Sequence, residues 1–309
     1  MLKGVKGKSK KHKAKIQKLR NLNTNGNVEK IGPVSVSFDD ELKIGTGSHG
    51  TSVYVGLHDD GSEVAVKRIL TETLKEDEMI IGNLSELKKS NNIVNYREVI
   101  FGDTFSYVIL DLCEETLADY IERLSEEDLE LRGPEIIREI LAGLSALHCG
   151  EKKVLHRDFK PLNILVDTAG HMRLADFGLS RMLDGSETSV NTGPKGTPGW
   201  IAAESIAKVK GETVKFKKKS DMQVVGMICF YILTKGEHPF GDRIHRLANI
   251  DKGDPVYLDK LSNSNAKRFV SWLISHDINE RPYVEEALND PYLRRRPHGT
   301  FVNFFNFLF

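Results

Sequence analysis

Three polar residues stand close together in the middle of the chain: Asp158, Lys160 and Asn163. Pro161 lies among them and keeps this segment from being a helix interior. An Asp can accept the proton of an attacking hydroxyl group, and a Lys two residues later can neutralise a moving phosphate. An Asn five residues on can hold a metal ion bound to ATP. These residue types at this spacing predict phosphoryl transfer, with Asp158 and Lys160 as catalytic residues.

A second motif, Asp-Phe-Gly, begins at Asp176, 13 residues after Asn163. Two short apolar segments, residues 163–166 and 172–175, flank a turn, so we expect them to bring Asn163 and Asp176 to the same point. Two oxygen ligands of this kind suit Mg²⁺, which completes its shell with water and phosphate. In order and spacing, the two motifs resemble the catalytic loop and the metal-binding motif of eukaryotic protein kinases, with Phe159 where Leu is usual.

A glycine-rich loop precedes both motifs, with Gly45, Gly47 and Gly50 in a G-x-G-x-x-G arrangement. Dinucleotide-binding folds use the same pattern, but there it opens a helix. Here residues 52–55 alternate as a strand does, and a turn follows at residues 59–61. The pattern therefore indicates a strand–loop–strand hairpin of the kinase kind, whose glycines let backbone N–H groups approach the ATP phosphates.

The strand after this loop departs from the usual kinase pattern. Kinases carry Val two residues after the last glycine, where it covers adenine, whereas this chain has Ser52 there and Val53 one place later. Either the strand is shifted by one residue or the roof of the nucleotide site is more polar than usual.

Residues 63–67 read as a strand that ends in Lys67, the residue predicted to pair with the α- and β-phosphates. A Lys on a strand is more often merely solvated, but its distance from the glycine-rich loop favours the phosphate role. Its partner should be a Glu on the next helix, where Glu78 fits the spacing best, Glu76 comes next and Glu86 is also available. If none of them pairs with Lys67, the enzyme would be weak or would need an activator.

The resemblance also implies a hinge at residues 111–113, whose backbone would hydrogen-bond adenine, with Leu110 limiting the depth of the pocket. Nothing in the sequence argues for a reactive Cys113 thiol, so we expect it to serve in packing. The candidate nucleotide-binding residues are Ile44, Gly45, Gly47, Gly50, Val53, Ala65, Lys67, Asp111 and Cys113.

The segment between Asp176 and Glu204 is rich in hydroxyl groups. Ser186, Thr188 and Ser189 are candidates for autophosphorylation, and Arg157 stands where it could bind such a phosphate. The alternative is a flexible polar loop without a regulatory role.

Further residues have expected structural or specificity roles. The resemblance implies a buried Glu204–Arg281 pair and an Asp221 that braces the catalytic loop, and Thr197 with Lys160 favours Ser or Thr as the acceptor. His148 and His156 are expected to pack rather than to act as bases. Residues 208–219 hold six Lys and are expected to form an exposed loop.

Composition bounds the class of protein. A hydrophobic fraction of 39% and a charged fraction of 28% suit a globular chain with a real core. No apolar run is long enough to span a bilayer, no secretory signal opens the chain, and three widely spaced Cys suit a reduced intracellular protein. The resemblance to protein kinases implies an α+β, bilobal fold, for which we expect a tail (residues 1–30), an N-lobe (31–112), a C-lobe (113–294) and an apolar tail (295–309).

The net charge of zero hides an asymmetry. Residues 1–20 hold nine Lys and Arg and no acid, so the remainder has 35 basic against 44 acidic residues, a net of −9. Such a tail is usually disordered and solvated, and we expect no packed structure over residues 1–30. The alternative is an electrostatic tether to RNA, an anionic lipid surface or an import receptor.

Four segments refine the resemblance, which covers residues 38–294. Residues 50–54, 112–117, 196–202 and 236–241 look like those of the inositol-requiring-enzyme-type kinase/endoribonucleases, the sensors of the unfolded-protein response. In that family, ATP-bound kinase domains form homodimers, trans-autophosphorylate and switch on a fused ribonuclease domain. The resemblance implies a cytoplasmic location at the cytosolic side of the endoplasmic reticulum, with the nucleus as an alternative.

After residue 293 this chain leaves room for no ribonuclease domain, only for a short apolar tail that would pack on the large lobe or mark a shortened product. Three hypotheses follow. The first is an active Ser/Thr kinase that uses ATP and Mg²⁺ on a protein substrate. The second is a nucleotide-regulated dimerisation or scaffold module with little catalysis. The third is an RNA-linked effector that binds through the Lys-rich tail.

Overall fold

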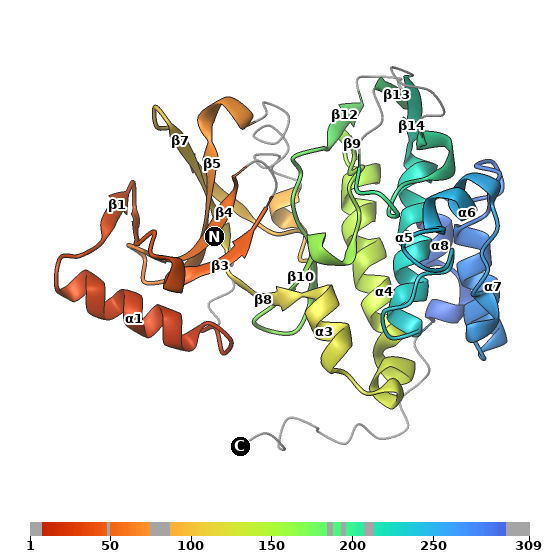
Figure 1. Ribbon diagram of the computed structural model, residues 1–309, viewed down its shortest axis with the longest axis horizontal. Coiled ribbons are helices and arrows are strands. Elements are labelled where there is room, and N and C mark those ends of the chain that lie inside the picture. The colour runs from red at the N-terminus through yellow and green to blue at the C-terminus, as the bar shows by residue number, and fades with distance from the viewer. Residues whose placement is uncertain are drawn as a thin grey trace.

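The computed structural model describes residues 8–47, 50–74, 87–183, 188–192, 196–206 and 213–294. These residues form two lobes, with a sheet of antiparallel strands on the left of Figure 1 and a group of helices on the right. Within the described ranges, no helix has both the length and the apolar character needed to cross a membrane.

The bounds of the elements are as follows. The α-helices are α1 (Lys13–Thr24), α3 (Leu117–Arg123), α4 (Glu126–Cys149), α5 (Lys218–Leu233), α6 (Arg246–Lys252), α7 (Ser264–Leu273) and α8 (Val284–Leu288). The strands are β1 (Glu29–Ile31), β2 (Val34–Val36), β3 (Lys43–Thr46), β4 (Ser52–His58), β5 (Glu63–Leu70), β6 (Tyr96–Ile100), β7 (Phe105–Asp111), β8 (Cys113–Thr116), β9 (Lys153–Leu155), β10 (Ile164–Asp167), β11 (Met172–Leu174), β12 (Arg181–Leu183), β13 (Ser189–Thr192) and β14 (Val214–Lys217). Short 3₁₀ turns include η1 (Asp40–Leu42), η4 (Pro161–Asn163) and η5 (Ala203–Ser205).

The N-lobe is built on one antiparallel sheet with the strand order β1-β2-β4-β5-β7-β6, to which β3 adds by pairing with β4. Alternation along β4 and β5 divides their side chains between two faces. Tyr54 and Val66 pack in the cluster on one face, and Val55 and Ala65 pack in the cluster on the other. The alternation predicted for these segments is therefore confirmed, and it decides which of the two clusters each side chain joins.

The C-lobe is organised around α5, which is buried on almost every side. The long helix α4 packs against it and begins at Glu126, because Ser125 and Asp128 form a capping box there. Two short strands, β10 and β11, pair beside α4, as predicted from the residues on either side of the turn.

The expectation of an unpacked tail over residues 1–30 was wrong for residues 8–30, which form helix α1 and strand β1. Helix α1 lies against the sheet, and Leu19 is 0% exposed. Ile16 and Leu19 recur at the spacing of one helical face, and this periodicity outweighs a composition that is mostly Lys. Residues 1–7 lie outside the described residues.

Another local expectation was also wrong. The expected exposed loop at residues 208–219 is, from residue 213 onward, strand β14 followed by the start of α5, with Val214 and Phe216 buried. The C-terminal tail, residues 295–309, lies outside the described residues.

Candidate active site

The Asp158 carboxylate lies at the centre of a tight polar network. It is only 6% exposed, and Lys160 Nζ donates to Oδ2 at 2.8 Å while Thr197 Oγ1 donates to Oδ1 at 2.8 Å. The Asn163 side-chain amide donates to Oδ2 and to the backbone carbonyl of Asp158, both at 2.9 Å. Lys160 also donates to Thr197 Oγ1 at 2.8 Å. The sequence-predicted pair Asp158 and Lys160 is thus brought together with a hydroxyl group from a segment 37 residues away.

The backbone before Asp158 is held by a buried carboxylate. Asp221, near the start of α5, accepts hydrogen bonds from the backbone N–H groups of His156 and Arg157, both at 3.0 Å. It also contacts the His148 ring at 2.9 Å. These contacts let Arg157 keep a φ of 68°, a left-handed conformation that is uncommon for a residue with a side chain. The bracing role expected of Asp221 is present, and both histidines are buried structural residues.

Asp176 stands across from this loop and forms an ion pair with Lys67 Nζ at 3.2 Å. Its carboxylate is 46% exposed, and its φ is 63°. Burial would raise the pKa of Asp176, but the charge and hydrogen bond of Lys67, with smaller effects from His156 and the Gly178 N–H, together lower the pKa below its ordinary value. His156 links the two motifs, because its ring contacts the carbonyl oxygen of Ala175 at 3.1 Å.

The donor set fits Mg²⁺. Both hydrogen bonds of the Asn163 amide nitrogen go to Asp158, so the amide oxygen takes no part in them. Asp176 supplies an ionised carboxylate. Oxygen ligands from one amide and one carboxylate leave the remaining positions of an octahedral shell to water and phosphate, which is how Mg²⁺ is commonly held.

The register of β4 and β5 shows whether Ser52 or Val53 lies on the side of the nucleotide site. Val53 pairs with Lys67, and Val55 pairs with Ala65, so these four side chains share one face of the sheet. Ser52 pairs with Arg68 and therefore points to the other face. Val53, not Ser52, lies on the side that carries Lys67, so the strand is shifted by one residue relative to the usual pattern.

The other candidate nucleotide-binding residues line up along the same strands. Ile44 and Gly45 lie in β3, and the Gly47 N–H donates to the Thr51 carbonyl at 2.9 Å, which closes the base of the glycine-rich loop. Gly50 has a φ of 75°, which a glycine adopts without strain. Residues 48 and 49 lie outside the described part.

The hinge residues play mainly structural roles through their side chains. The Asp111 carboxylate accepts from Arg97 Nε at 2.6 Å, so its expected contribution to adenine binding rests on the backbone. Burial raises the pKa of the Cys113 thiol to about 12, which agrees with a packing role. The predicted partners of Lys67, namely Glu78, Glu76 and Glu86, all lie outside the described residues.

The Arg157 guanidinium is an unusual buried cation. Arg157 is 4% exposed, and its Nε and one terminal nitrogen have no hydrogen-bond partner within the described residues. It lies over the ring of Phe216 in β14, at 5.7 Å from the ring centre. Strand β14 pairs with β13, which begins at Ser189, one residue after the exposed Thr188. Ser186 lies outside the described residues.

One expected long-range pair is present. Arg281, 1% exposed, donates to both carboxylate oxygens of Glu204 at 2.9 and 2.8 Å. This bidentate pair ties η5, at the end of the segment after Asp176, to the far side of the C-lobe.

Sequence reasoning missed the contacts of the N-terminal segment with the hinge. Ser9, Lys10 and Lys11 all donate to Glu114, the residue after Cys113. The spacing of Ile16 and Leu19 was the one signal that could have indicated a docked helix.

Comparisons with known proteins agree with this geometry. The model of the protein kinase domain family matches residues 38–293. The chain is 34% identical over 263 residues to the serine/threonine-protein kinase/endoribonuclease ire-1 of Caenorhabditis elegans, covering 81% of this chain and 26% of that protein. It is 31% identical over 275 residues to the serine/threonine-protein kinase/endoribonuclease IRE2 of Homo sapiens, covering 84% of this chain and 29% of that protein.

A third relative is the sensor for unfolded proteins in the ER ire1 of Schizosaccharomyces pombe, 32% identical over 280 residues, covering 80% of this chain and 26% of that protein. The chain thus spans about a quarter of the length of these curated relatives. Together with the bilobal fold and the arrangement of Asp158, Asn163 and Asp176, the matches show that the chain belongs to the protein kinase family and is similar to its IRE1-type members.

Proposed function

We propose that this chain is an active, ATP-dependent serine/threonine kinase. The observation that carries the proposal is the Asp158 network, in which a buried carboxylate faces Lys160, Asn163 and the Thr197 hydroxyl group within 2.9 Å. The Lys67–Asp176 pair stands opposite it. The four groups that phosphoryl transfer needs from a kinase are therefore all present in this chain: Asp158, Asn163, Asp176 and Lys67.

In the proposed reaction, the hydroxyl oxygen of a Ser or Thr side chain attacks the γ-phosphorus of ATP. The bond to the β–γ bridging oxygen breaks, ADP leaves, and the hydroxyl proton passes to the Asp158 carboxylate. Lys160 stabilises the charge that develops on the transferred group, and Lys67 orients the α- and β-phosphates. Asn163 and Asp176 would hold Mg²⁺, which supplies charge neutralisation on the phosphates.

The same chain is proposed as its own substrate. Thr188 is exposed and precedes β13, whose partner strand β14 carries the Phe216 ring that lies under Arg157. A phosphate on Thr188, Ser189 or Ser186 would bring the acceptor oxygens that the Arg157 guanidinium lacks among the described residues. Autophosphorylation would therefore order this segment against the catalytic loop.

The relatives suggest a setting for this activity. Their names describe kinase/endoribonucleases and a sensor for unfolded proteins in the ER. By this similarity we propose that the chain acts as a homodimer in unfolded-protein signalling at the cytosolic side of the endoplasmic reticulum. Phosphorylation in trans is the activity that such a dimer would support.

Incubation of the purified protein with Mg-ATP, followed by phosphosite mapping by mass spectrometry, tests the proposal. We expect phosphate at Ser186, Thr188 or Ser189 in the wild type and none in Asp158→Asn. Asp259→Asn is the matched control, because Asp259 is exposed and pairs only with Lys267 in the described structure. It should be phosphorylated like the wild type.

Absence of phosphate from all three proteins would overturn the kinase proposal. If the unmodified wild type still bound ATP, a nucleotide-regulated dimerisation or scaffold module would replace it.

A further inference from the structure

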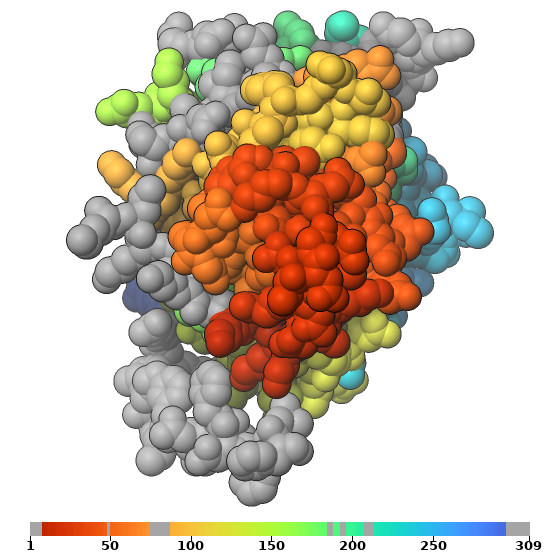
Figure 2. Space-filling model, turned by 90° about the vertical axis from the view of Figure 1, so that its left-hand side faces the viewer, coloured from red at the N-terminus to blue at the C-terminus, as the bar shows by residue number. Residues whose placement is uncertain are grey.

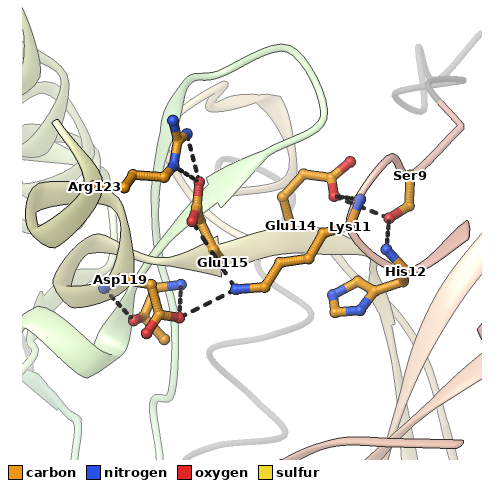
Figure 3. Close-up of polar contacts among 8 residues, drawn as sticks. Ser9, Lys11, His12, Glu114, Glu115, Asp119 and Arg123 are labelled. Carbon is orange, nitrogen blue, oxygen red and sulfur yellow. Dashed lines mark hydrogen bonds and ion pairs between the residues drawn. The ribbon is translucent and has the colours of Figure 1, made fainter. Parts of the chain in front are cut away.

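The Glu114 carboxylate is held by the start of the N-terminal segment. The backbone N–H of Lys10 donates to Oε1 at 2.8 Å, the backbone N–H of Lys11 donates to Oε2 at 2.8 Å, and the Ser9 hydroxyl group donates to Oε2 at 3.0 Å. Figure 3 shows this contact, with Glu114 pointing toward Ser9 and Lys11. Three donors, two of them backbone N–H groups in the turn before α1, therefore bind this one carboxylate specifically. That carboxylate belongs to the residue directly after the hinge.

A second carboxylate, Glu63 at the start of β5, is held in the same way. It accepts from the Ser9 backbone N–H at 2.9 Å and from Arg20 at 3.2 Å. Ser9 is 4% exposed, and its hydroxyl oxygen also accepts from the His12 N–H at 2.9 Å. Strand β5 continues to Lys67, so the N-terminal segment fixes the start of the strand that carries the phosphate-binding lysine.

Helix α1 extends the apolar wall of the nucleotide site. Ile16 and Leu19 belong to one buried cluster with Ala65 and Leu112. The partly buried residues packed against this cluster include the candidate pocket residues Ile44, Val53 and Leu110. The helix therefore packs on the same face of the sheet as the side chains that would contact adenine.

The segment also reaches the C-lobe. Lys11 Nζ lies 3.4 Å from Asp119 in α3 and 4.0 Å from Glu115 in β8 (Figure 3). Figure 2, which faces the N-lobe, shows the red N-terminal segment on the surface of that lobe, with yellow-green residues of the C-lobe at its lower edge. The Lys11–Asp119 pair is exposed and contributes little stability, so it orients the segment rather than holds it.

Most of these contacts end on the hinge or on the strands beside it, at Glu114 and Glu115 in β8 and at Glu63 in β5. Lys11 also reaches Asp119 in α3, and Lys18 pairs with Glu41 in η1. We propose that residues 9–24, which we name the N-terminal strap, are a positioning element of the nucleotide site, and that the docked strap raises the affinity for adenine nucleotide. The inference rests on the proposed function, because it assumes that the cleft between the lobes binds ATP.

The physical basis is pre-organisation. A docked strap holds the backbone around Cys113 and the side chains of Ile44 and Val53 in one arrangement, so less conformational freedom is lost when nucleotide binds. Coupling between two binding events is reciprocal. Nucleotide must therefore stabilise the docked strap by the same factor by which the strap improves nucleotide binding.

The test compares three strap variants in the full chain. Ser9→Asp places a negative charge against Glu114 and Glu63, and Ser9→Ala removes only the hydroxyl contacts. Ala14→Asp adds the same charge at an exposed position of α1 and is the matched control. We expect the Kd for Mg-ADP, measured by titration calorimetry, to rise at least about fivefold in Ser9→Asp, less in Ser9→Ala and not at all in Ala14→Asp.

Hydrogen exchange supplies the reciprocal measurement. Saturating Mg-ADP should slow exchange in peptides covering residues 9–24 of the wild type and should have less effect in Ser9→Asp. In kinase assays, Ser9→Asp should raise the KM for ATP and leave kcat unchanged, because the strap does not touch Asp158. A general loss of folding would instead lower kcat and increase exchange throughout the chain.

The outcomes separate this proposal from the one on which it rests. If the wild type does not bind Mg-ADP, the proposed function fails. If the wild type binds Mg-ADP but all three variants bind equally well and nucleotide leaves strap exchange unchanged, the strap has no positioning role. Tighter binding by Ser9→Asp would show that the docked strap opposes nucleotide, which also overturns the proposal.

Discussion

At the scale of single residues, the site depends on backbone conformations that could not be predicted from the sequence. Arg157 and Asp176 both have positive φ values, 68° and 63°. Neither residue is a glycine, so each conformation is held by its surroundings: Asp221 accepts the Arg157 N–H, and Lys67 pairs with the Asp176 carboxylate. Two of the three non-glycine residues with positive φ in the described part of the chain therefore lie in the candidate site, and the third is Lys235.

A buried histidine gives a prediction at the same scale. Burial, with a smaller effect from the Arg246 cation, lowers the pKa of His238 to about 2, and its ring packs edge-on against Trp200. In the unfolded chain the pKa of His238 is near 6.5. Below pH 6.5 the histidine therefore binds a proton in the unfolded state but stays neutral in the folded state. The free energy of unfolding consequently decreases as the pH falls below 6.5, and this group has no effect on it above that pH.

We expect this one group to contribute a slope of about 1.4 kcal/mol per pH unit below pH 6.5. Denaturant unfolding at pH 7.5, 6.0 and 5.0 measures it. His238→Gln is the comparison, because its amide oxygen can still accept from the Phe240 N–H as Nδ1 does at 3.2 Å. Equal pH slopes in the two proteins would show that His238 is not buried in its neutral form.

At the scale of elements, the packing of the C-lobe depends on a close contact between helices α5 and α7. A Cβ added to Gly226 in α5 would come within 2.6 Å of Leu273 Cβ and of Ile274 Cγ2, and within 3.2 Å of the Ile274 backbone nitrogen. A backbone atom at the end of α7 cannot move away without moving the helix. The absence of a side chain at Gly226 is thus what sets the distance between α5 and α7.

Gly226→Ala is expected to lower the free energy of unfolding by about 1–3 kcal/mol, because overpacking outweighs the better helix propensity of Ala. Gly133→Ala in α4 is the control. Its added Cβ would meet the flexible end of Leu233 at 2.8 Å, which can turn aside. Thermal unfolding of both variants measures the difference, and equal melting temperatures would contradict this account of the α5–α7 contact.

At the scale of the whole molecule, the charge asymmetry has an internal explanation. The basic N-terminal residues and the net −9 of the remainder meet on the protein itself, through pairs such as Arg20 with Glu63, Lys18 with Glu41 and Lys11 with Asp119. The tail that composition assigned to solvent, RNA or a lipid surface therefore has acidic partners within its own chain. The basic N-terminal segment and the acidic remainder therefore balance each other's charge within one folded unit.

The proposed dimer makes a prediction about kinetics. If autophosphorylation occurs in trans, the initial rate should rise with the square of the protein concentration below the dimer Kd. Wild type should also phosphorylate Asp158→Asn when the two are mixed. A rate per molecule that does not depend on concentration, with Asp158→Asn left unmodified in the mixture, would indicate phosphorylation in cis.

The sequence by itself determined the chemistry and the class of fold. Asp158, Lys160 and Asn163 lie within one loop, and the alternation of β4 and β5 is local, so spacing alone predicted them. The tertiary structure decided the rest. Register placed Val53 beside Lys67, and packing against the sheet turned a Lys-rich segment into a docked helix. The contact of Asp221 with the catalytic loop was expected only from the family resemblance, because it joins segments 64 residues apart. Local patterns report which face a residue occupies, whereas which distant segment covers that face depends on the whole fold.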